Sequence, residues 1–166
     1  MRRISLPIFA VLFLAASGIA QTRGIGAGGY VQAGNAGETG GLNAKLFLTP
    51  ATAVDFSMSV ETDPFGQSMG FYASYLMHYW DLIPVHEGKL PLYVGPNLGV
   101  GVWSNSGGGT ALRAGAIGGM AYCLPQGTAP IDIYVQLNPT FEYNTADNAL
   151  RMDMYLQLGV RFFFDN

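Results

Sequence analysis

The last segment of the chain constrains its fold more than any other feature. From Leu150 to Phe164 every even-numbered residue is apolar, whereas the odd-numbered positions include Arg151, Asp153 and Arg161. Successive residues of a β-strand point to opposite faces, so this segment is expected to be one long strand with an apolar face and a polar face. A soluble barrel would turn the apolar face inward, and a membrane barrel would turn it toward lipid.

The same two-residue period recurs along the rest of the chain. Clusters of Gly, Pro, Asn, Asp and Ser separate segments in which apolar and polar residues alternate, a pattern typical of strands joined by turns. Pro96 and Pro139 fall inside such segments, and we expect each to mark a β-bulge, because proline cannot donate a hydrogen bond to a neighbouring strand. The predicted strands are 24–32, 42–48, 54–61, 69–80, 92–102, 112–122, 131–144 and 150–164.

The composition favours a membrane over water around these strands. Apolar residues make up 49% of the chain and charged residues 11%, against roughly 25% charged residues in soluble domains. Beyond the first twenty residues, no apolar stretch is long enough for a membrane-spanning helix. An even number of strands, most of them long enough to span when tilted, is typical of outer-membrane barrels. The sequence therefore predicts an all-β fold: an eight-stranded antiparallel up-and-down transmembrane β-barrel.

The first twenty residues have the pattern of a secretory signal peptide. Arg2 and Arg3 precede an apolar stretch, and small residues follow as far as Ala20, where we expect cleavage. The expected organisation is a signal peptide over 1–20 and an outer-membrane β-barrel domain over 21–166, in the outer membrane of a Gram-negative-type cell. Loss of the two arginines changes the formal charge from −3 to −5. With no basic patch, the sequence gives no support for nucleic-acid binding.

The charged residues indicate which face is inside. All those in the predicted strands share the polar face, where they are interspersed with Gly, Ser, Asn, Tyr and Gln and nearly balance in sign. A narrow lumen accounts for this better than a surface in water, which would carry many more charges. The sequence therefore predicts a lumen charge network of Lys45, Asp55, Glu61, Arg113, Asp132, Glu142, Arg151, Asp153 and Arg161.

The last hairpin supports this orientation. If its loop is Thr145 to Asn148, Glu142 faces Arg151 and Asp132 faces Arg161, so that two complementary pairs share one face. Reversing the two faces would place the charges of this hairpin in lipid, at about 2–4 kcal/mol each near the bilayer midplane. We therefore expect the apolar face to point outward.

The tail "QLGVRFFF" resembles the recognition signal of outer-membrane barrels, with Gln157, Gly159, Phe162 and Phe164 at its defining positions. This resemblance implies recognition by the barrel-assembly machinery. The stretches "YLMHYWDLIPVHEGKLPLYVG" and "APIDIYVQLNPTFEYN" are similar to a family of small, uncharacterised outer-membrane barrels, broadly OmpA/OmpX-like in architecture. The resemblance implies an eight-stranded barrel and no established activity, and a proline at the position of Pro139 is part of it.

The sequence offers little for catalysis. Ser74 and His78 share a strand face, but four strand residues separate them by roughly 13 Å, too far for a hydrogen bond. His86 has no cluster of metal ligands beside it, and Cys123 is the one cysteine. We expect no enzyme activity, cofactor or metal, and a structural or interaction role for a monomer that contacts outer-membrane lipid. A small-solute pore and a soluble lipocalin-like ligand-binding barrel are the alternatives.

Overall fold

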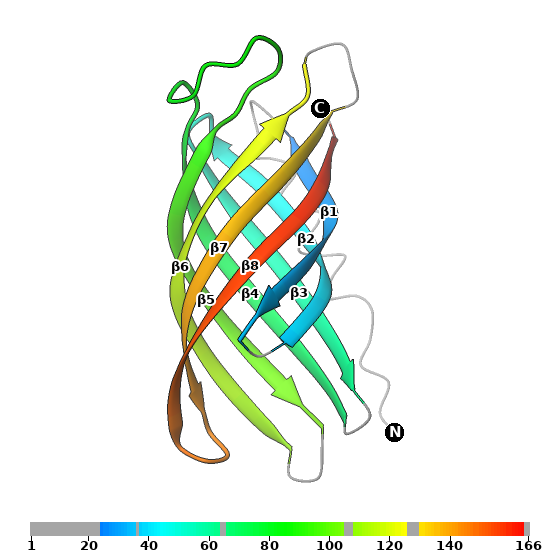
Figure 1. The fold of residues 1–166 in the computed structure, drawn as a ribbon, viewed down its shortest axis with the longest axis vertical. Helices are drawn as coiled ribbons and strands as arrows, with labels where there is room; N and C mark the ends of the chain where they lie inside the picture. The colour runs from blue at the N-terminus through cyan, green and yellow to red at the C-terminus, as the bar shows by residue number, and fades with distance from the viewer. Residues whose placement is uncertain (1–23, 36, 64–65, 105–107, 126–129, 165–166) are drawn as a thin grey trace.

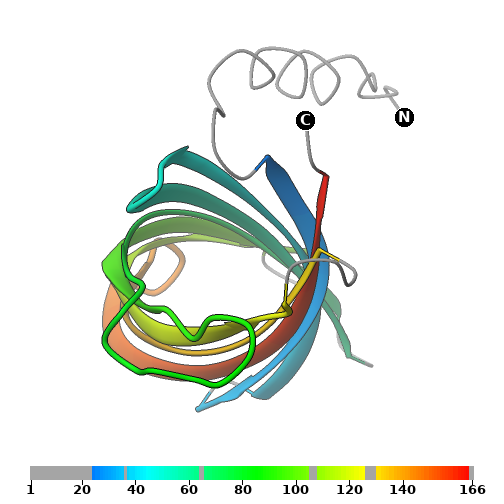
Figure 2. The same cartoon turned by 90° about the horizontal axis from the view of Figure 1, so that it is seen from above.

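The computed structural model describes residues 24–35, 37–63, 66–104, 108–125 and 130–164. The expected signal peptide lies outside these residues. Eight antiparallel strands, each hydrogen-bonded to the next, close into one barrel when β8 pairs with β1 (Figures 1 and 2). The strands are β1 Ile25–Gly34, β2 Gly37–Thr49, β3 Thr52–Asp63, β4 Gly66–Tyr79, β5 Leu92–Trp103, β6 Gly109–Cys123, β7 Ile131–Asn144 and β8 Ala149–Phe164.

The pairing register fixes the slope of the strands. Starting at Phe163 on β8, the paired residues run around the barrel through Lys45 on β2 and Asn97 on β5, and they return to β8 at Asp153. One circuit thus displaces the register by ten residues, from 163 to 153. Closure with a stagger of this kind tilts strands by about 35–45° to the barrel axis.

The two ends of the barrel differ. β1 begins and β8 ends at the upper end in Figure 1, which we call the terminal end. The hairpins β1–β2, β3–β4, β5–β6 and β7–β8 turn at the opposite end, which we call the hairpin end. The β1–β2 hairpin stops well short of the β7–β8 hairpin in Figure 1, so the barrel wall is shorter on the β1–β2 side. Accordingly, β8 pairs with β1 only from Tyr155 to Phe164.

The predicted strands are recovered, with β7 identical and the others shifted at their ends. The largest shift is in β2, which begins at Gly37 rather than residue 42. Glu38 therefore belongs to a strand, where it is exposed opposite Ala33, and our expectation that every strand charge lies on the lumen side fails at this position. Glu38 lies at the very end of the strand, next to the turn, where water rather than lipid can surround it.

The predicted bulges at the two prolines are wrong. Beside Pro96 the β4–β5 pairing lapses between Ser74↔Asn97 and Met77↔Val94, and it resumes in the same register. Beside Pro139 the β6–β7 pairing lapses in the same way. A missing N–H removes a rung of the ladder without requiring an extra residue, so neither strand shifts. The register does shift elsewhere, between Phe47 and Thr49 next to the β2–β3 turn.

The two faces of the wall have opposite character. Large apolar side chains point outward and are exposed, among them Leu150 at 70%, Leu98 at 64% and Leu42 at 63%. Most polar side chains of the strands, and aromatic ones such as Tyr93 and Tyr134, point inward and are buried. Among the described residues, no helix is long and apolar enough to cross a membrane.

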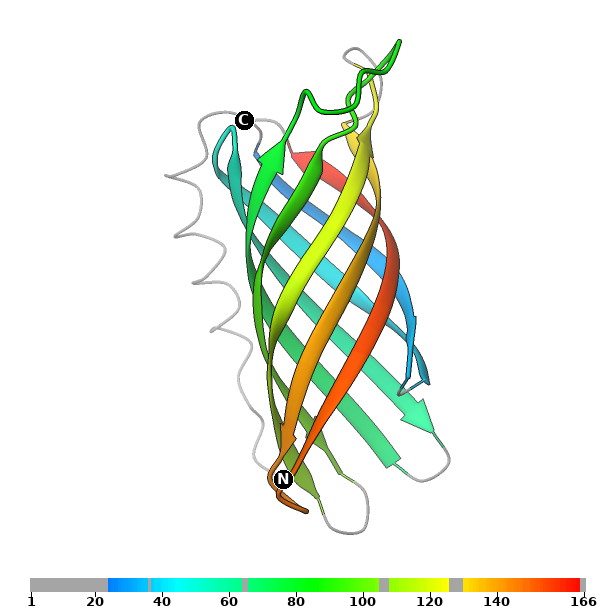
Figure 3. The same ribbon diagram turned by 60° about the vertical axis from the view of Figure 1, so that its left-hand side comes forward.

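The longest described connection joins β4 to β5 at the terminal end (Figure 3). Its second half is fixed to the end of β6, since Lys89 and Cys123 form an isolated antiparallel bridge and the amide of Ala121 donates to the Pro91 carbonyl. Leu82, near its start, is 63% exposed.

Candidate functional site: the barrel lumen

The lumen holds the buried polar and charged side chains of the described residues. Because side chains alternate along each strand, one residue in two points inward, and these positions carry the polar residues of the sequence. The buried polar and charged residues are Gln32, Asn43, Lys45, Asp55, Ser59, Ser74, His78, Asn97, Asp132, Gln136, Asn138, Thr140, Glu142, Gln157 and Arg161.

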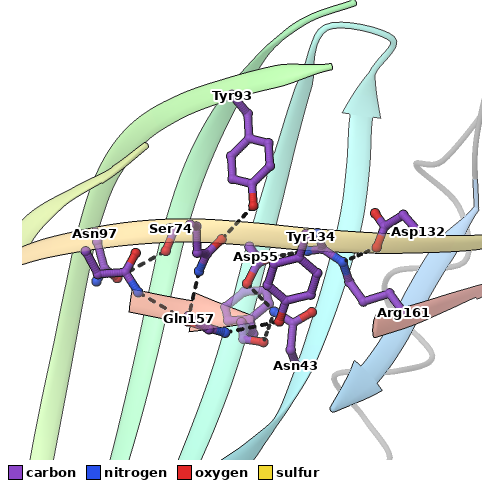
Figure 4. A network of polar contacts seen from close by, with 12 residues as sticks. Asn43, Asp55, Ser74, Tyr93, Asn97, Asp132, Tyr134, Gln157 and Arg161 are labelled. Atoms are coloured by element: carbon purple, nitrogen blue, oxygen red, sulfur yellow. Dashed lines mark hydrogen bonds and ion pairs between the residues drawn. The ribbon is translucent and has the colours of Figure 1, made fainter. Parts of the chain in front are cut away.

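Arg161 on β8 is the centre of a buried charge cluster near the terminal end (Figure 4). Its Nε donates to Asp132 Oδ1 on β7 at 2.9 Å, and its Nη1 donates to Asp55 Oδ2 on β3 at 2.7 Å. The side chains of these three residues are 0–4% exposed. Arg161 thus joins β3 to β7 across the lumen, and the ring of Tyr134 lies 3.9 Å from its guanidinium carbon.

Lys45 adds a second cation to this cluster. Its side chain is 1% exposed, and its ammonium lies 4.7 Å from the centre of the Tyr93 ring and 5.1 Å from that of Phe47. Asn43, two residues before it, donates from Nδ2 to Asp55 at 2.5 Å. Two cations and two carboxylates together carry no net charge, which offsets part of the cost of removing four charges from water. We call Lys45, Asp55, Asp132 and Arg161 the four-charge cluster.

Neutral amides and phenols fill the middle of the lumen. Tyr93 donates to Gln136, and Gln136 donates to Gln157, at 2.8 and 2.9 Å (Figure 4). Asn138 also donates to the same oxygen of Gln157, at 3.1 Å, and Gln157 donates to the Tyr134 hydroxyl at 3.0 Å. These bonds link β5, β7 and β8 through side chains alone, and we call Tyr93, Tyr134, Gln136, Asn138 and Gln157 the amide network.

A second ion pair lies toward the hairpin end. Arg113 on β6 donates from Nε to Glu142 on β7 at 2.6 Å and from Nη1 to the Tyr72 hydroxyl on β4 at 2.5 Å. The side chains of Arg113 and Glu142 are 17% and 11% exposed, more than any member of the Arg161 ion pairs. Burial therefore decreases from the terminal end to the hairpin end.

Glycines on the inner face make room for the large side chains. A Cβ added at Gly159 would lie 2.5 Å from Tyr134 ring and hydroxyl atoms, and one at Gly101 would lie 3.0 Å from the Arg113 guanidinium carbon. Both distances are shorter than ordinary van der Waals contacts. The interior of an eight-stranded barrel is just wide enough for its side chains, so each bulky residue requires a small one beside it.

A small polar cavity remains between the amide network and the Arg113–Glu142 pair. Its volume is about 10 Å³, close to the minimum that one water molecule requires. Its lining is uncharged, and Ile117 is the one apolar side chain in it; the lining residues are Gln32, Ser57, Tyr72, Asn97, Ile117, Gln136, Asn138, Thr140, Tyr155 and Gln157.

The structure brings together part of the predicted charge network. The register of the last hairpin has Glu142 opposite Arg151 and Asp132 opposite Arg161, as expected. However, Glu142 bonds to Arg113, and Arg151 instead pairs with Asp147 in its own hairpin, with side chains 56% and 44% exposed. The reason is that the barrel wall is short at β1, whose pairing with β8 begins only at Tyr155. Arg151 and Asp153 therefore lie beyond the hairpin end of the lumen. The Glu61 side chain lies outside the described residues.

The predicted assembly-signal residues have structural contacts as well. Gln157 belongs to the amide network, Gly159 accommodates Tyr134, and Phe162 and Phe164 point outward with ring centres 5.4 Å apart. Recognition by an assembly machinery stays a prediction.

Sequence reasoning missed the amide network and a cluster of aromatic side chains at the terminal end. The rings of Phe47, His78, Trp80 and Phe163 pack together at the terminal end of the lumen, with centres of contacting rings 5.0–6.0 Å apart, and we call them the aromatic cluster. The inward parity of these residues and of the glutamines was visible in the sequence, but their partners lie on distant strands. Ser74 donates to Asn97 rather than to His78. Among the described residues, no group of three or more His, Cys, Asp or Glu could hold a metal ion.

The described strands form a closed antiparallel barrel of eight strands with an apolar outer wall and a polar lumen, and solved structures share this barrel fold. The crystal structure of the N-terminal β-barrel domain of Pseudomonas aeruginosa OprF matches 84% of this chain and 96% of its own, with a TM-score of 0.57 and 17% identity. That of Neisserial surface protein A (NspA) matches the same shares, with a TM-score of 0.51 and 15% identity. Both are eight-stranded outer-membrane barrels, and the predicted fold class is confirmed. No protein-family model and no curated protein sequence matches the chain.

Proposed function

We propose that this chain is an integral outer-membrane protein whose lumen is plugged by its own polar and paired charged side chains. Its role is structural or interactive rather than catalytic. The observation that carries the proposal is the inverted polarity of the barrel: Leu150 and Leu98 are 70% and 64% exposed outside, whereas Arg161 is fully buried inside.

Lipid accounts for this polarity, and water does not. Transfer of exposed apolar surface out of water is favourable by about 25 cal/mol per Å², so the outer wall is stabilised by a hydrocarbon environment. A soluble lipocalin-like barrel needs the opposite arrangement, with apolar residues around its cavity. The strands also satisfy the requirement that backbone hydrogen bonds close within the protein, because a closed barrel has no free edge.

The lumen contacts favour a plug over a small-solute pore. The four-charge cluster and the aromatic cluster occupy the terminal end, and the small cavity on their hairpin-end side measures about 10 Å³. Passage of a hydrated ion through the terminal end would require the Arg161 ion pairs, which span the lumen, to separate.

The proposal includes export by the amino-terminal signal peptide, insertion by the barrel-assembly machinery and a monomeric state in lipid. The tail residues Gln157, Gly159, Phe162 and Phe164 are those proposed to contact the machinery.

Two measurements test the proposal. The protein should require detergent to stay in solution and should migrate differently on gels before and after heating, as folded outer-membrane barrels do; solubility without detergent contradicts the membrane location. In planar bilayers the barrel should show no steady conductance steps. Steps that appear in the unaltered protein, and that change size in the Arg113→Ala variant, would establish the pore instead.

A further inference from the structure

The small cavity of the lumen is surrounded by buried side chains. Its lining residues come from every strand except β2. Eight of the ten are at most 9% exposed: Gln32, Asn97, Ile117, Gln136, Asn138, Thr140, Tyr155 and Gln157. A molecule in this cavity is therefore shielded from bulk solvent and has hydrogen-bonding groups on nearly every side.

One of the lining side chains carries a buried acceptor without a partner. Asn138 on β7 is 7% exposed, and its Nδ2 donates to Gln157 Oε1 at 3.1 Å. Because an amide oxygen only accepts, the Asn138 amide has to turn its N–H groups toward Gln157. Its own Oδ1 then has no hydrogen-bond partner among the described residues. Burial of such an acceptor is unfavourable, so a group that donates to this oxygen stabilises the lumen.

The size and the charge of the cavity select that donor. A volume of about 10 Å³ holds one water molecule and nothing larger. The lining contains no charged side chain, so a cation bound here would have no neighbouring negative charge to offset its loss of hydration.

Other lining groups supply the further bonds that a buried water requires. Such a water makes about three hydrogen bonds to polar groups that otherwise lack a partner. Asn97 on β5 accepts from Ser74 through its Oδ1, and its Nδ2 carries two N–H donors. Gln32 on β1 brings a second amide to the lining. Donors for the water oxygen thus come from strands on both sides of Asn138.

We propose that this cavity is the binding site of one resident water molecule. The water donates to Asn138 Oδ1 and accepts an N–H from the lining amides Asn97 and Gln32. It thereby extends the amide network from β7 to other strands of the wall, and it belongs to the plug as much as the side chains do. The inference depends on the closed lumen and not on the membrane location.

A crystal structure of the unaltered full barrel, at a resolution that shows ordered waters, tests the site directly. We expect a single density in the cavity at about 2.7–2.8 Å from Asn138 Oδ1, the usual length of an O–H···O hydrogen bond. In detergent micelles, oxygen-17 relaxation dispersion of the water signal counts the waters that stay inside the protein longer than surface waters do. The unaltered barrel should show this contribution.

Two variants and a matched control assign the contribution to this cavity. Ser57→Thr adds a methyl group to the lining, and Asn138→Leu removes the acceptor at similar side-chain volume. Each should lower the dispersion amplitude by the contribution of one water molecule. Ser59→Thr makes the same change two residues further along β3, at a position that is 7% exposed and outside the lining. It should leave the amplitude unchanged.

The outcomes separate this proposal from the proposed function. An empty cavity in a structure that shows other buried waters, a density with metal-ligand contacts, or an Asn138 Oδ1 that accepts from a protein donor overturns the water site. An amplitude that neither variant lowers also overturns it. The need for detergent and the absence of conductance are measured independently, so these results leave the membrane plug standing. Because the crystal structure uses the unaltered protein, the test does not depend on the folding of any variant.

Discussion

Removal of Arg161 is the most informative perturbation of this barrel. The Arg161→Met variant keeps a long side chain but removes the guanidinium that bonds to Asp55 and Asp132. Both carboxylates are buried, with side chains at most 4% exposed, and Lys45 can balance only one of them. Breaking a buried ion pair by removing one partner costs about 3–5 kcal/mol, so the free energy of unfolding should fall by that amount.

Arg151→Met provides a matched control on the same strand. Arg151 pairs with Asp147, but the two side chains are 56% and 44% exposed, and an exposed pair contributes about 0–1 kcal/mol. Reversible urea unfolding of the barrel in lipid vesicles, followed by tryptophan fluorescence and by mobility on unheated gels, gives both values. Equal effects of the two substitutions, or a loss below about 1 kcal/mol for Arg161→Met, would refute the reasoning that burial sets the strength of the cluster.

Two further predictions use the same unfolding assay, and a third measures the rate of insertion. Gly159→Ala should destabilise the barrel by about 1–3 kcal/mol, since its Cβ would overlap Tyr134, whereas Gly118→Ala should change stability little. Leu137→Arg, which places a charge on the outer wall, should cost about 2–4 kcal/mol if it lies near the bilayer midplane, and Phe162→Arg near the terminal end about 0–1 kcal/mol; equal costs would contradict a membrane around the wall. Phe164→Ala should slow insertion by purified assembly machinery while barely changing equilibrium stability, because the ring is 54% exposed; an unchanged insertion rate would remove it from the signal.

The sequence by itself determined the number of strands and the direction in which their side chains point. Period-two alternation is a property of neighbouring residues, so it is legible without any knowledge of distant strands. The register of the β7–β8 hairpin also followed, because its turn at Thr145–Asn148 and its complementary charges are local to one hairpin. The expectation about bulges at Pro96 and Pro139 failed, since the effect of a missing N–H depends on the neighbouring strand.

Only the tertiary structure decided which lumen groups meet. Arg161 and Asp55 are separated by 106 residues in sequence, and they meet because closure of β8 on β1 brings β3 and β8 around one narrow lumen. Glu142 bonds to Arg113 rather than to Arg151, because the ten-residue stagger and the short β1–β2 hairpin leave Arg151 beyond the hairpin end of the lumen. The alternation of residues predicts the face to which a side chain points. Its bonding partner depends on the stagger of the strands and on their lengths around the barrel, which are properties of the closed structure.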